Sequence, residues 1–269
     1  MFAMAEEMKS QRGPHEEALF QSVRNYYSTP QSLSHYGDAA KHGGLHPPER
    51  AMVARFMTAP ARVLDVGCGA GREAFELVRM GFAVTALDIA AKLLTEAKRI
   101  ARELGLTVDF RLSDGKSLDF PQESFDYVLL ITQMIHHVPF RANRVRLLGE
   151  AGRVVKRTGS VLLTYHDWTI EKDHEPWGWR NGRPLREPDS SLFPDPPRAT
   201  EPGDYFTNDC QGTPTEVLGF CHRFTGPEME EEVLAAGLEI VQRASFATIA
   251  GGEPDDFWKP TQVLLLRPT

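Results

Sequence analysis

Residues 63–71 read VLDVGCGAG, an apolar run that stops at Gly67 and continues through Gly69 and Gly71. The apolar run is typical of a buried strand, and the residues after the glycines predict a helix that ends near Gly81. Glycine in such a turn permits positive φ and lets the backbone approach a ligand with no Cβ in the way. The start of the helix adds unpaired N–H groups and the positive end of a dipole.

Strands and helices alternate along the chain after this turn. We expect strands at residues 62–67, 82–88, 107–112, 125–131 and 160–166, and helices at 71–81, 90–105 and 140–156. This alternation is typical of βαβ units, so we expect an α/β fold, a mostly parallel sheet with helices on both faces. A helix at 226–237 and strands at 238–249 and 261–268 follow, and the two late strands predict an antiparallel hairpin at the edge of the sheet.

Two segments fall outside this alternation. In residues 1–60 we predict helices at 16–27 and 49–57, with a break that starts near Pro30. We expect this segment to be a helical lid, with an ordinary surface segment as the alternative. Residues 168–224 are rich in Pro, Gly and Trp and are too long for an ordinary loop inside a compact domain. We interpret them as a substrate cap inserted into a second unit that spans residues 61–269.

The composition excludes several classes of protein. The chain has 30 Lys and Arg against 37 Asp and Glu, a net charge of −7, so it has no general attraction to nucleic acid or anionic lipid. Cys68, Cys210 and Cys221 are too few for a disulfide framework and favour a reducing compartment. The first residues do not resemble a secretory signal, and no apolar run approaches the roughly 20 residues of a membrane span. We therefore expect a soluble, cytoplasmic protein with no membrane partner.

Two acidic residues beside the glycines indicate the kind of ligand. Asp88 ends the second predicted strand, where a carboxylate can accept hydrogen bonds from both hydroxyls of a ribose. Asp65 lies two residues before Gly67 and would repel a pyrophosphate, and the spacing G-x-G-x-G differs from the G-x-G-x-x-G of NAD sites. A cationic nucleoside fits better, such as S-adenosyl-L-methionine (SAM) with its amino and sulfonium groups.

Four stretches together resemble the class I SAM-dependent methyltransferases, most closely the type 11 group. They are VLDVGCGAG, TALDIA, LSDGKSLDFPQESFD and QMIHHV, and the resemblance covers residues 61–166. It implies a Rossmann-like sheet of seven strands, mostly parallel with the last strand antiparallel, and a cap after the fifth strand. It also implies a methyltransferase enzyme with SAM as cofactor and S-adenosyl-L-homocysteine as product.

The resemblance also implies nine cofactor contacts, which are Asp65, Gly67, Gly69, Gly71, Asp88, Ile89, Asp114, Gly115 and Gln133. The first four would lie along the methionine and ribose portions, and Asp88 would bind the ribose hydroxyls. Ile89, Asp114 and Gly115 would surround the adenine, and Gln133 would face the methionine or the substrate. An aspartate before a glycine is also a common turn former, so Asp114 has a structural alternative.

Methyl transfer from a sulfonium needs mainly positioning, and it needs a base only if the acceptor must lose a proton. His137 and His166 follow the fourth and fifth predicted strands and are our candidates for catalytic residues. Packing or helix capping is the alternative for both.

Four further residues are candidates for binding the substrate, namely Tyr36, His136, Trp177 and Trp179. The alternative for the aromatic residues of the cap is a satellite core. Cys210, Cys221 and His222 resemble half a metal site, but four ligands at tight spacing are absent, so we expect no metal.

The prediction of the methyl acceptor depends on the charge of the predicted cap. Residues 169–224 contain six Lys or Arg and ten Asp or Glu, and 6 − 10 gives −4, which argues against a phosphate-binding cap. We therefore expect a small-molecule acceptor, a natural product or metabolite, methylated on O, N or C. One alternative comes from a loose resemblance of residues 134–155, 176–183 and 220–237 to wobble-uridine tRNA methyltransferases. In such an enzyme Arg141, Arg144, Arg146 and Arg153 would form a basic stripe on one helix, although a solvated helix face explains the stripe as well. Another alternative is a SAM-binding protein without catalysis.

Overall fold

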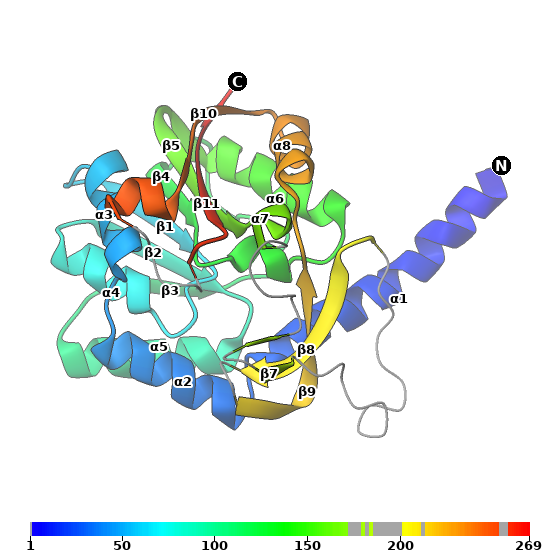
Figure 1. Ribbon diagram of the computed structural model, residues 1–269, viewed down its shortest axis with the longest axis horizontal. Coiled ribbons are helices and arrows are strands. Elements are labelled where there is room, and N and C mark those ends of the chain that lie inside the picture. The colour runs from blue at the N-terminus through cyan, green and yellow to red at the C-terminus, as the bar shows by residue number, and fades with distance from the viewer. Residues whose placement is uncertain (1, 172–178, 181–182, 185–200, 211–212, 253–257) are drawn as a thin grey trace.

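The computed structural model describes residues 2–171, 179–180, 183–184, 201–210, 213–252 and 258–269. A seven-stranded sheet with the order β10-β11-β5-β4-β1-β2-β3 forms the centre of this described part (Figure 1). Its strands are β1 (Arg62–Val66), β2 (Ala83–Asp88), β3 (Asp109–Leu112), β4 (Phe125–Leu130), β5 (Val155–His166), β10 (Leu238–Ser245) and β11 (Thr261–Pro268). β11 pairs antiparallel with β5 and β10, and the pairings among β1 to β5 are parallel. The predicted mostly parallel sheet with an antiparallel last strand is confirmed.

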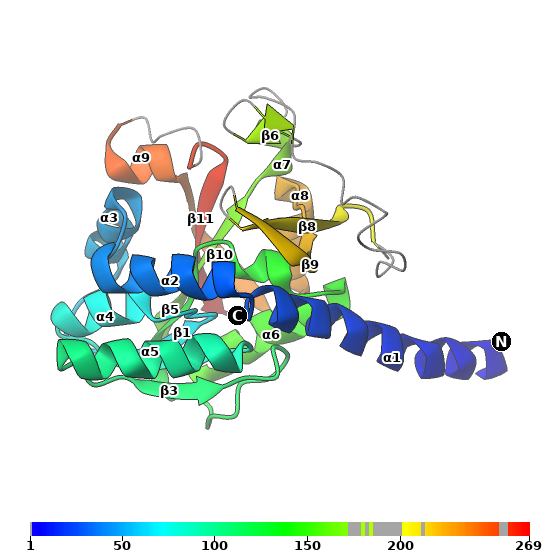
Figure 2. The same ribbon diagram turned by 90° about the horizontal axis from the view of Figure 1, so that it is seen from below.

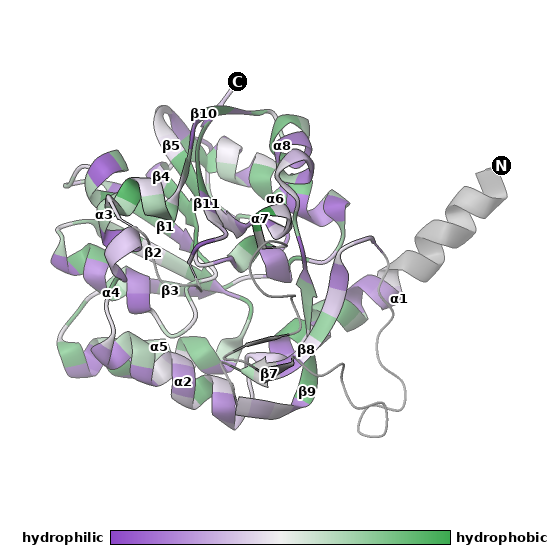
Figure 3. Cartoon of the chain, viewed as in Figure 1, coloured by the Kyte–Doolittle hydropathy of each residue, from purple (hydrophilic) through white to green (hydrophobic). Residues whose placement is uncertain are grey.

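Helices cover both faces of the sheet. α4 (Arg72–Arg79), α5 (Ala91–Leu104) and α9 (Phe246–Ala250) lie on one face, with α2 (Pro30–His42) and α3 (Pro47–Phe56). α6 (Arg141–Val154) and α8 (Gly226–Ala235) lie on the other face (Figure 2). Successive strand residues point to opposite faces, so Val63 joins the first core cluster and Leu64 the second. Figure 3 shows hydrophobic residues along the central strands and mixed residues on the helices, as expected for helices with one packed face.

The N-terminal segment is more helical than predicted. α1 (Phe2–Tyr26) is followed at once by α2, so Pro30 begins a helix instead of ending the helical region. Proline is well suited to the first helical position, where its missing N–H costs nothing. Thr29 caps the new helix by accepting a hydrogen bond from the Ser32 N–H at 3.2 Å.

The described part of the cap contains an antiparallel hairpin of β8 (Asp204–Cys210) and β9 (Thr213–His222), which the irregular sequence did not predict. The hairpin packs on α1, and Leu19, Val23 and Phe220 share a small core there. The cap also has a short helix, α7 (Trp168–Glu171), and two short strands, β6 (Trp179–Arg180) and β7 (Arg183–Pro184).

The strand predicted at 238–249 was too long, whereas the last predicted strand, at 261–268, coincides with β11. β10 ends at Ser245, and residues 246–249 belong to α9 instead. Ser245 stops the strand because its hydroxyl accepts the Thr248 N–H and caps the helix. Among the described residues, no helix is both long and apolar enough to cross a membrane.

Candidate functional site

The glycine loop between β1 and α4 lies at the carboxyl edge of the sheet. Gly67, Gly69 and Gly71 have φ of 81°, 54° and 95°, a region that favours glycine. A Cβ on Gly67 would lie 2.1 Å from the Cγ of Met134, so no larger residue fits there without movement. The Gly67 N–H donates to the Leu87 carbonyl at 2.8 Å, which fixes the loop against β2.

Asp88 joins this loop to the end of β2. Its Oδ2 accepts the Gly69 N–H at 2.8 Å and its Oδ1 accepts the Ala90 N–H at 2.7 Å. Burial raises the pKa of Asp88, and the backbone N–H groups counteract this in part. A carboxylate has about four acceptor positions. Both oxygens of Asp88 therefore keep capacity for the two hydroxyls of a ribose, as the sequence resemblance implies.

Asp65 and Gln133 carry buried polar atoms that lack a hydrogen-bond partner among the described residues. The atoms are Asp65 Oδ2, an acceptor, and Gln133 Nε2, a donor. Leaving such an atom unpaired costs about 1–3 kcal/mol. The methionine end of SAM carries an ammonium and a carboxylate, which match an acceptor and a donor. The residues present therefore fit this cofactor.

The backbone at the end of β4 is strained beside these atoms. Thr132 and Gln133 have φ of 55° and 58°, and neither is glycine. Left-handed conformations of this kind cost of order 1–3 kcal/mol each and cluster at functional sites. They turn the chain from β4 into the 3₁₀ helix η1 (Met134–His137), which carries two of the three predicted histidines, His136 and His137.

The predicted adenine region brings a residue of α1 beside two of the predicted contacts. A Cβ on Gly115, whose φ is 77°, would lie 2.9 Å from a ring carbon of Phe20 and 3.2 Å from Ile89 Cδ1. The sequence did not identify Phe20, on α1, as a residue of this region. Its helix could be predicted, but not the side of the helix that packs against the sheet. Asp114 is exposed, and its carboxylate accepts the Lys116 and Ser117 N–H groups at 2.8 Å each. Asp114 thus forms the turn that the sequence left as its alternative.

His137 connects η1 to both the N-terminal segment and the cap. Its Nδ1 lies 3.1 Å from the Phe220 carbonyl oxygen, and its Nε2 lies 2.7 Å from the Tyr27 hydroxyl. A carbonyl only accepts, so Nδ1 carries the hydrogen and Nε2 accepts from the hydroxyl. Burial lowers the pKa of His137, and it raises the pKa of Tyr27 well above its ordinary value. The pair is therefore a neutral imidazole with a bound phenol.

His136 has a structural place instead of the predicted contact with substrate. Its Nδ1 donates to the His222 carbonyl at 2.7 Å, and its Nε2 accepts the His166 N–H at 3.0 Å. Burial lowers the pKa of His136 well below its ordinary value, so the ring is neutral. Both ring nitrogens are used to join η1, β5 and β9, and neither is left for a substrate.

The remaining predicted residues lie around these histidines or outside the described part. His166 is buried at the end of β5, with its ring 5.9 Å from that of His136. Tyr36 lies on α2, with its ring 5.6 Å from that of Tyr27. Trp177 lies outside the described residues, and so does the side chain of Trp179.

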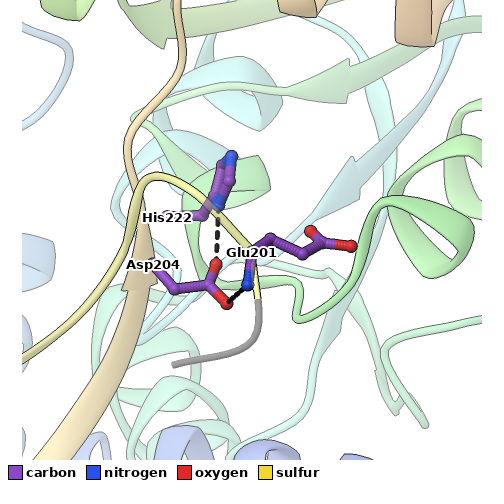
Figure 4. A group of neighbouring side chains, drawn as sticks. All are labelled: Glu201, Asp204 and His222. Atoms are coloured by element: carbon purple, nitrogen blue, oxygen red, sulfur yellow. Dashed lines mark hydrogen bonds and ion pairs between the residues drawn. The ribbon is translucent and has the colours of Figure 1, made fainter. Parts of the chain in front are cut away.

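A second group of ionisable side chains lies at the base of the cap (Figure 4). His222 donates from Nδ1 to Asp204 at 2.7 Å and from Nε2 to Glu228 at 3.0 Å. Burial alone would lower the pKa of His222, but the two carboxylates raise it above its ordinary value. Glu201, Asp204 and His222 are close enough to bind one metal ion. A carboxylate already lies within hydrogen-bond distance of each ring nitrogen, so a metal ion would have to displace one of these contacts of His222.

Arg144 completes this group and corrects the predicted basic stripe. Its side chain is 0 % exposed and pairs with Glu232 at 2.6 Å and Glu201 at 3.0 Å. Arg153 donates to the Leu118 and Phe120 carbonyls. These two guanidinium groups stabilise the fold, so Arg144 does not contribute to a basic surface, whereas Arg141 and Arg146 are exposed on α6.

Comparison with known proteins agrees with this geometry. Residues 63–159 match the methyltransferase domain family. Over 112 residues the chain is 42 % identical to a ubiquinone biosynthesis O-methyltransferase of Xanthomonas axonopodis, a match that covers 41 % of this chain and 45 % of the relative. An enzyme of the same name from Paramagnetospirillum magneticum is 44 % identical over 77 residues, 29 % of this chain and 30 % of that one. The match thus spans less than half the length of these curated relatives.

Solved structures share the fold over more of the chain. A SAM-dependent methyltransferase from Methanosarcina mazei is 22 % identical, with a TM-score of 0.60 over 84 % of this chain and 98 % of that one. One from Clostridium acetobutylicum is 12 % identical, with a TM-score of 0.61 over 87 % and 97 %. The CcbJ methyltransferase from Streptomyces caelestis is 17 % identical, with a TM-score of 0.59 over 87 % and 98 %. At these identities the likeness shows the fold.

Proposed function

We propose that this chain, whose fold and residues 63–159 are those of a class I SAM-dependent methyltransferase, transfers a methyl group from SAM to a hydroxyl of a small aromatic molecule. The names of the matched relatives support the choice of oxygen, since they are O-methyltransferases. The acidic net charge of −7 supports a small acceptor over a nucleic acid.

The observation that carries the proposal is the contact between His137 and Tyr27. A hydroxyl becomes a strong nucleophile when a base takes its proton, and a neutral imidazole suits this task near neutral pH. His137 Nε2 is an acceptor that already lies 2.7 Å from a phenolic hydroxyl. The Phe220 carbonyl holds the other nitrogen and fixes the tautomer. A phenol of the substrate that took the place of the Tyr27 hydroxyl would meet the same nitrogen.

The cofactor supplies an activated methyl group, and the chain supplies binding and proton transfer. Asp65 would bind the ammonium of SAM, Gln133 its carboxylate and Asp88 its ribose hydroxyls. The glycines of the loop let the backbone lie against the cofactor. His137 would take the proton of the acceptor, and His166, at the neighbouring strand end, remains our candidate for contact with the acceptor.

The two alternatives differ in their support. A tRNA methyltransferase was suggested in part by a basic stripe on α6, and the buried ion pairs of Arg144 take one of the four arginines out of that stripe, which weakens this alternative. A SAM-binding protein without catalysis would have no need for a neutral imidazole that contacts a hydroxyl. The thiols of Cys68, Cys210 and Cys221 are buried and form no disulfide among the described residues, which supports a reducing compartment such as the cytoplasm.

Calorimetric titration with S-adenosyl-L-homocysteine, with NAD as the control, tests the first half of the proposal. We expect micromolar binding of the former and no binding of NAD. Transfer of labelled methyl from SAM to a set of phenols, with bulk tRNA in parallel, tests the second half. Methylated tRNA with unmodified phenols would favour the alternative. Cofactor binding without any transfer would indicate a protein without catalysis.

A further inference from the structure

Four ionisable side chains form a buried cluster behind the glycine loop. They are Asp65 on β1, Glu49 on α3, and Arg72 and Glu73 at the start of α4. All four are buried, and Arg72, the most exposed of them, is 8 % exposed. Three carboxylates against one guanidinium give 1 − 3, a formal charge of −2 when all are ionised. Burying uncompensated charge is costly, so such a cluster attracts either protons or a cation.

The contacts show which carboxylate is left over. Glu49 holds Arg72 through two bonds, at 2.6 and 2.8 Å. Glu73 also pairs with Arg72 and accepts the Thr132 hydroxyl at 2.7 Å. Asp65 is 2 % exposed, and its Oδ2 has no hydrogen-bond partner among the described residues. Arg72 is thus shared by the two glutamates, and Asp65 is the member with an unused acceptor.

The electrostatics of Asp65 follow from this arrangement. Burial raises the pKa of Asp65 well above its ordinary value, the negative charge of Glu73 raises it further, and Arg72 opposes the shift. Asp88 on β2 and Glu49 on α3 also raise it. The thiol of Cys68, whose pKa burial raises, adds no charge near neutral pH. Burial and the negative neighbours thus favour the protonated form of Asp65 in the free protein, whereas a cation bound beside it would favour the ionised form.

We propose that this cluster makes the site distinguish the cationic cofactor from its neutral product, with Asp65 giving up a proton when the cofactor binds. SAM carries a sulfonium, an ammonium and a carboxylate, so its methionine end has a net charge of +1. The product has lost the sulfonium charge and is neutral there. A site with excess negative charge holds the first more tightly and releases the second after transfer. This inference rests on the proposed cofactor site and extends it to selectivity and product release.

Calorimetry of the full-length protein tests the proposal. SAM, S-adenosyl-L-homocysteine and sinefungin, which carries an amine in place of the sulfonium centre, are each titrated at neutral pH in buffers of different ionisation enthalpy. The dependence of the heat on the buffer gives the number of protons released. We expect SAM and sinefungin to bind at least about tenfold more tightly than the product and to release more protons.

Two variants and one control isolate the cluster. Asp65→Asn should lose the proton release and most of the preference for the cationic ligands while it still binds the product. Glu73→Gln should lower the proton release and the preference for the cationic ligands as well. This second variant tests the cluster even if Asp65→Asn does not fold. Asp109→Asn is the control, because it removes an exposed carboxylate of β3 with the same change in charge. It should leave the proton release and the ligand preference unchanged.

The results separate this inference from the proposed function. Equal affinity of the wild type for SAM and the product, with equal proton release, would overturn the charge selection and leave the methyltransferase proposal intact. An Asp65→Asn variant that keeps the full preference would also overturn it. No binding of any of the three ligands would overturn both proposals.

Discussion

The Tyr27 hydroxyl lies 2.7 Å from Nε2 of His137, although 110 residues separate the two in the sequence. Tyr27 follows the end of α1, and His137 ends η1 at the carboxyl edge of the sheet. The rings meet edge to face, with centroids 5.2 Å apart. A phenol is thus seated on the imidazole where the proposed reaction places the acceptor.

The first prediction concerns this pair. His137→Ala removes the proposed base, so turnover of a phenolic acceptor should fall by about 10²–10⁴ while the affinity for S-adenosyl-L-homocysteine stays within about threefold. Tyr27→Phe is the matched control, because it keeps the ring and removes only the hydroxyl that occupies Nε2. It should change turnover by less than about tenfold. Unchanged turnover in His137→Ala would remove this residue from the mechanism.

The second prediction is a pH profile. A base acts only when it is unprotonated, and burial lowers the pKa of His137 below its ordinary value of 6.5. The rate should therefore stay level as the pH falls from 8 to about 6.5 and should drop only below that value. The measurement is kcat/KM for a phenolic acceptor across this range. A value of kcat/KM that already drops as the pH is lowered from 8 to 7 would contradict a neutral, buried base.

The third prediction concerns the cofactor. Asp88→Ala removes the acceptor of the Gly69 and Ala90 N–H groups and the proposed ribose ligand, so cofactor affinity should fall by about 1–3 kcal/mol. Asp126→Asn is the control, since Asp126 lies at the opposite end of the strands and pairs with Lys156 at 2.6 Å. Calorimetry with S-adenosyl-L-homocysteine measures both. Equal losses in the two variants would point to general destabilisation instead.

The fourth prediction compares two arginines of α6. Arg144→Ala leaves Glu232 buried without its partner and should lower the free energy of unfolding by about 3–5 kcal/mol. Arg146→Ala changes an exposed residue of the same helix and should lie within about 0.5 kcal/mol of the wild type. Urea denaturation measures both values. Similar stabilities for the two variants would mean that Arg144 does not hold the cap.

The fifth prediction gives the sign of a pH effect on stability. The folded pKa of His222 is raised above the unfolded value by Asp204 and Glu228. Its contribution is therefore complete below about pH 6.5 and is lost as the pH rises through the folded pKa. The difference in unfolding free energy between wild type and His222→Asn should be larger at pH 6 than at pH 9. A larger difference at pH 9 would show that the folded pKa of His222 lies below its unfolded value.

The sequence predicted what is local. The glycine loop, Asp88 and the strand-helix alternation follow from short patterns whose geometry is set by neighbouring residues. Other features depend on packing between segments that are far apart in the sequence, and helical or strand periodicity does not predict them. They are the contact of Tyr27 with His137, the position of Phe20 and the β8–β9 hairpin. Pro30 was misread because a proline ends one helix and begins another equally well. Asp114 forms the turn that its local sequence predicts, and its contact with adenine stays a prediction.

The most direct test of the account is transfer of a labelled methyl group from SAM to small phenols by the wild type and by His137→Ala, with bound cofactor verified in both. We predict a methyl ether with the wild type and a loss of about 10²–10⁴ in rate with the variant. A wild-type protein that binds SAM and methylates no hydroxyl, or a variant that methylates phenols equally fast, would contradict it.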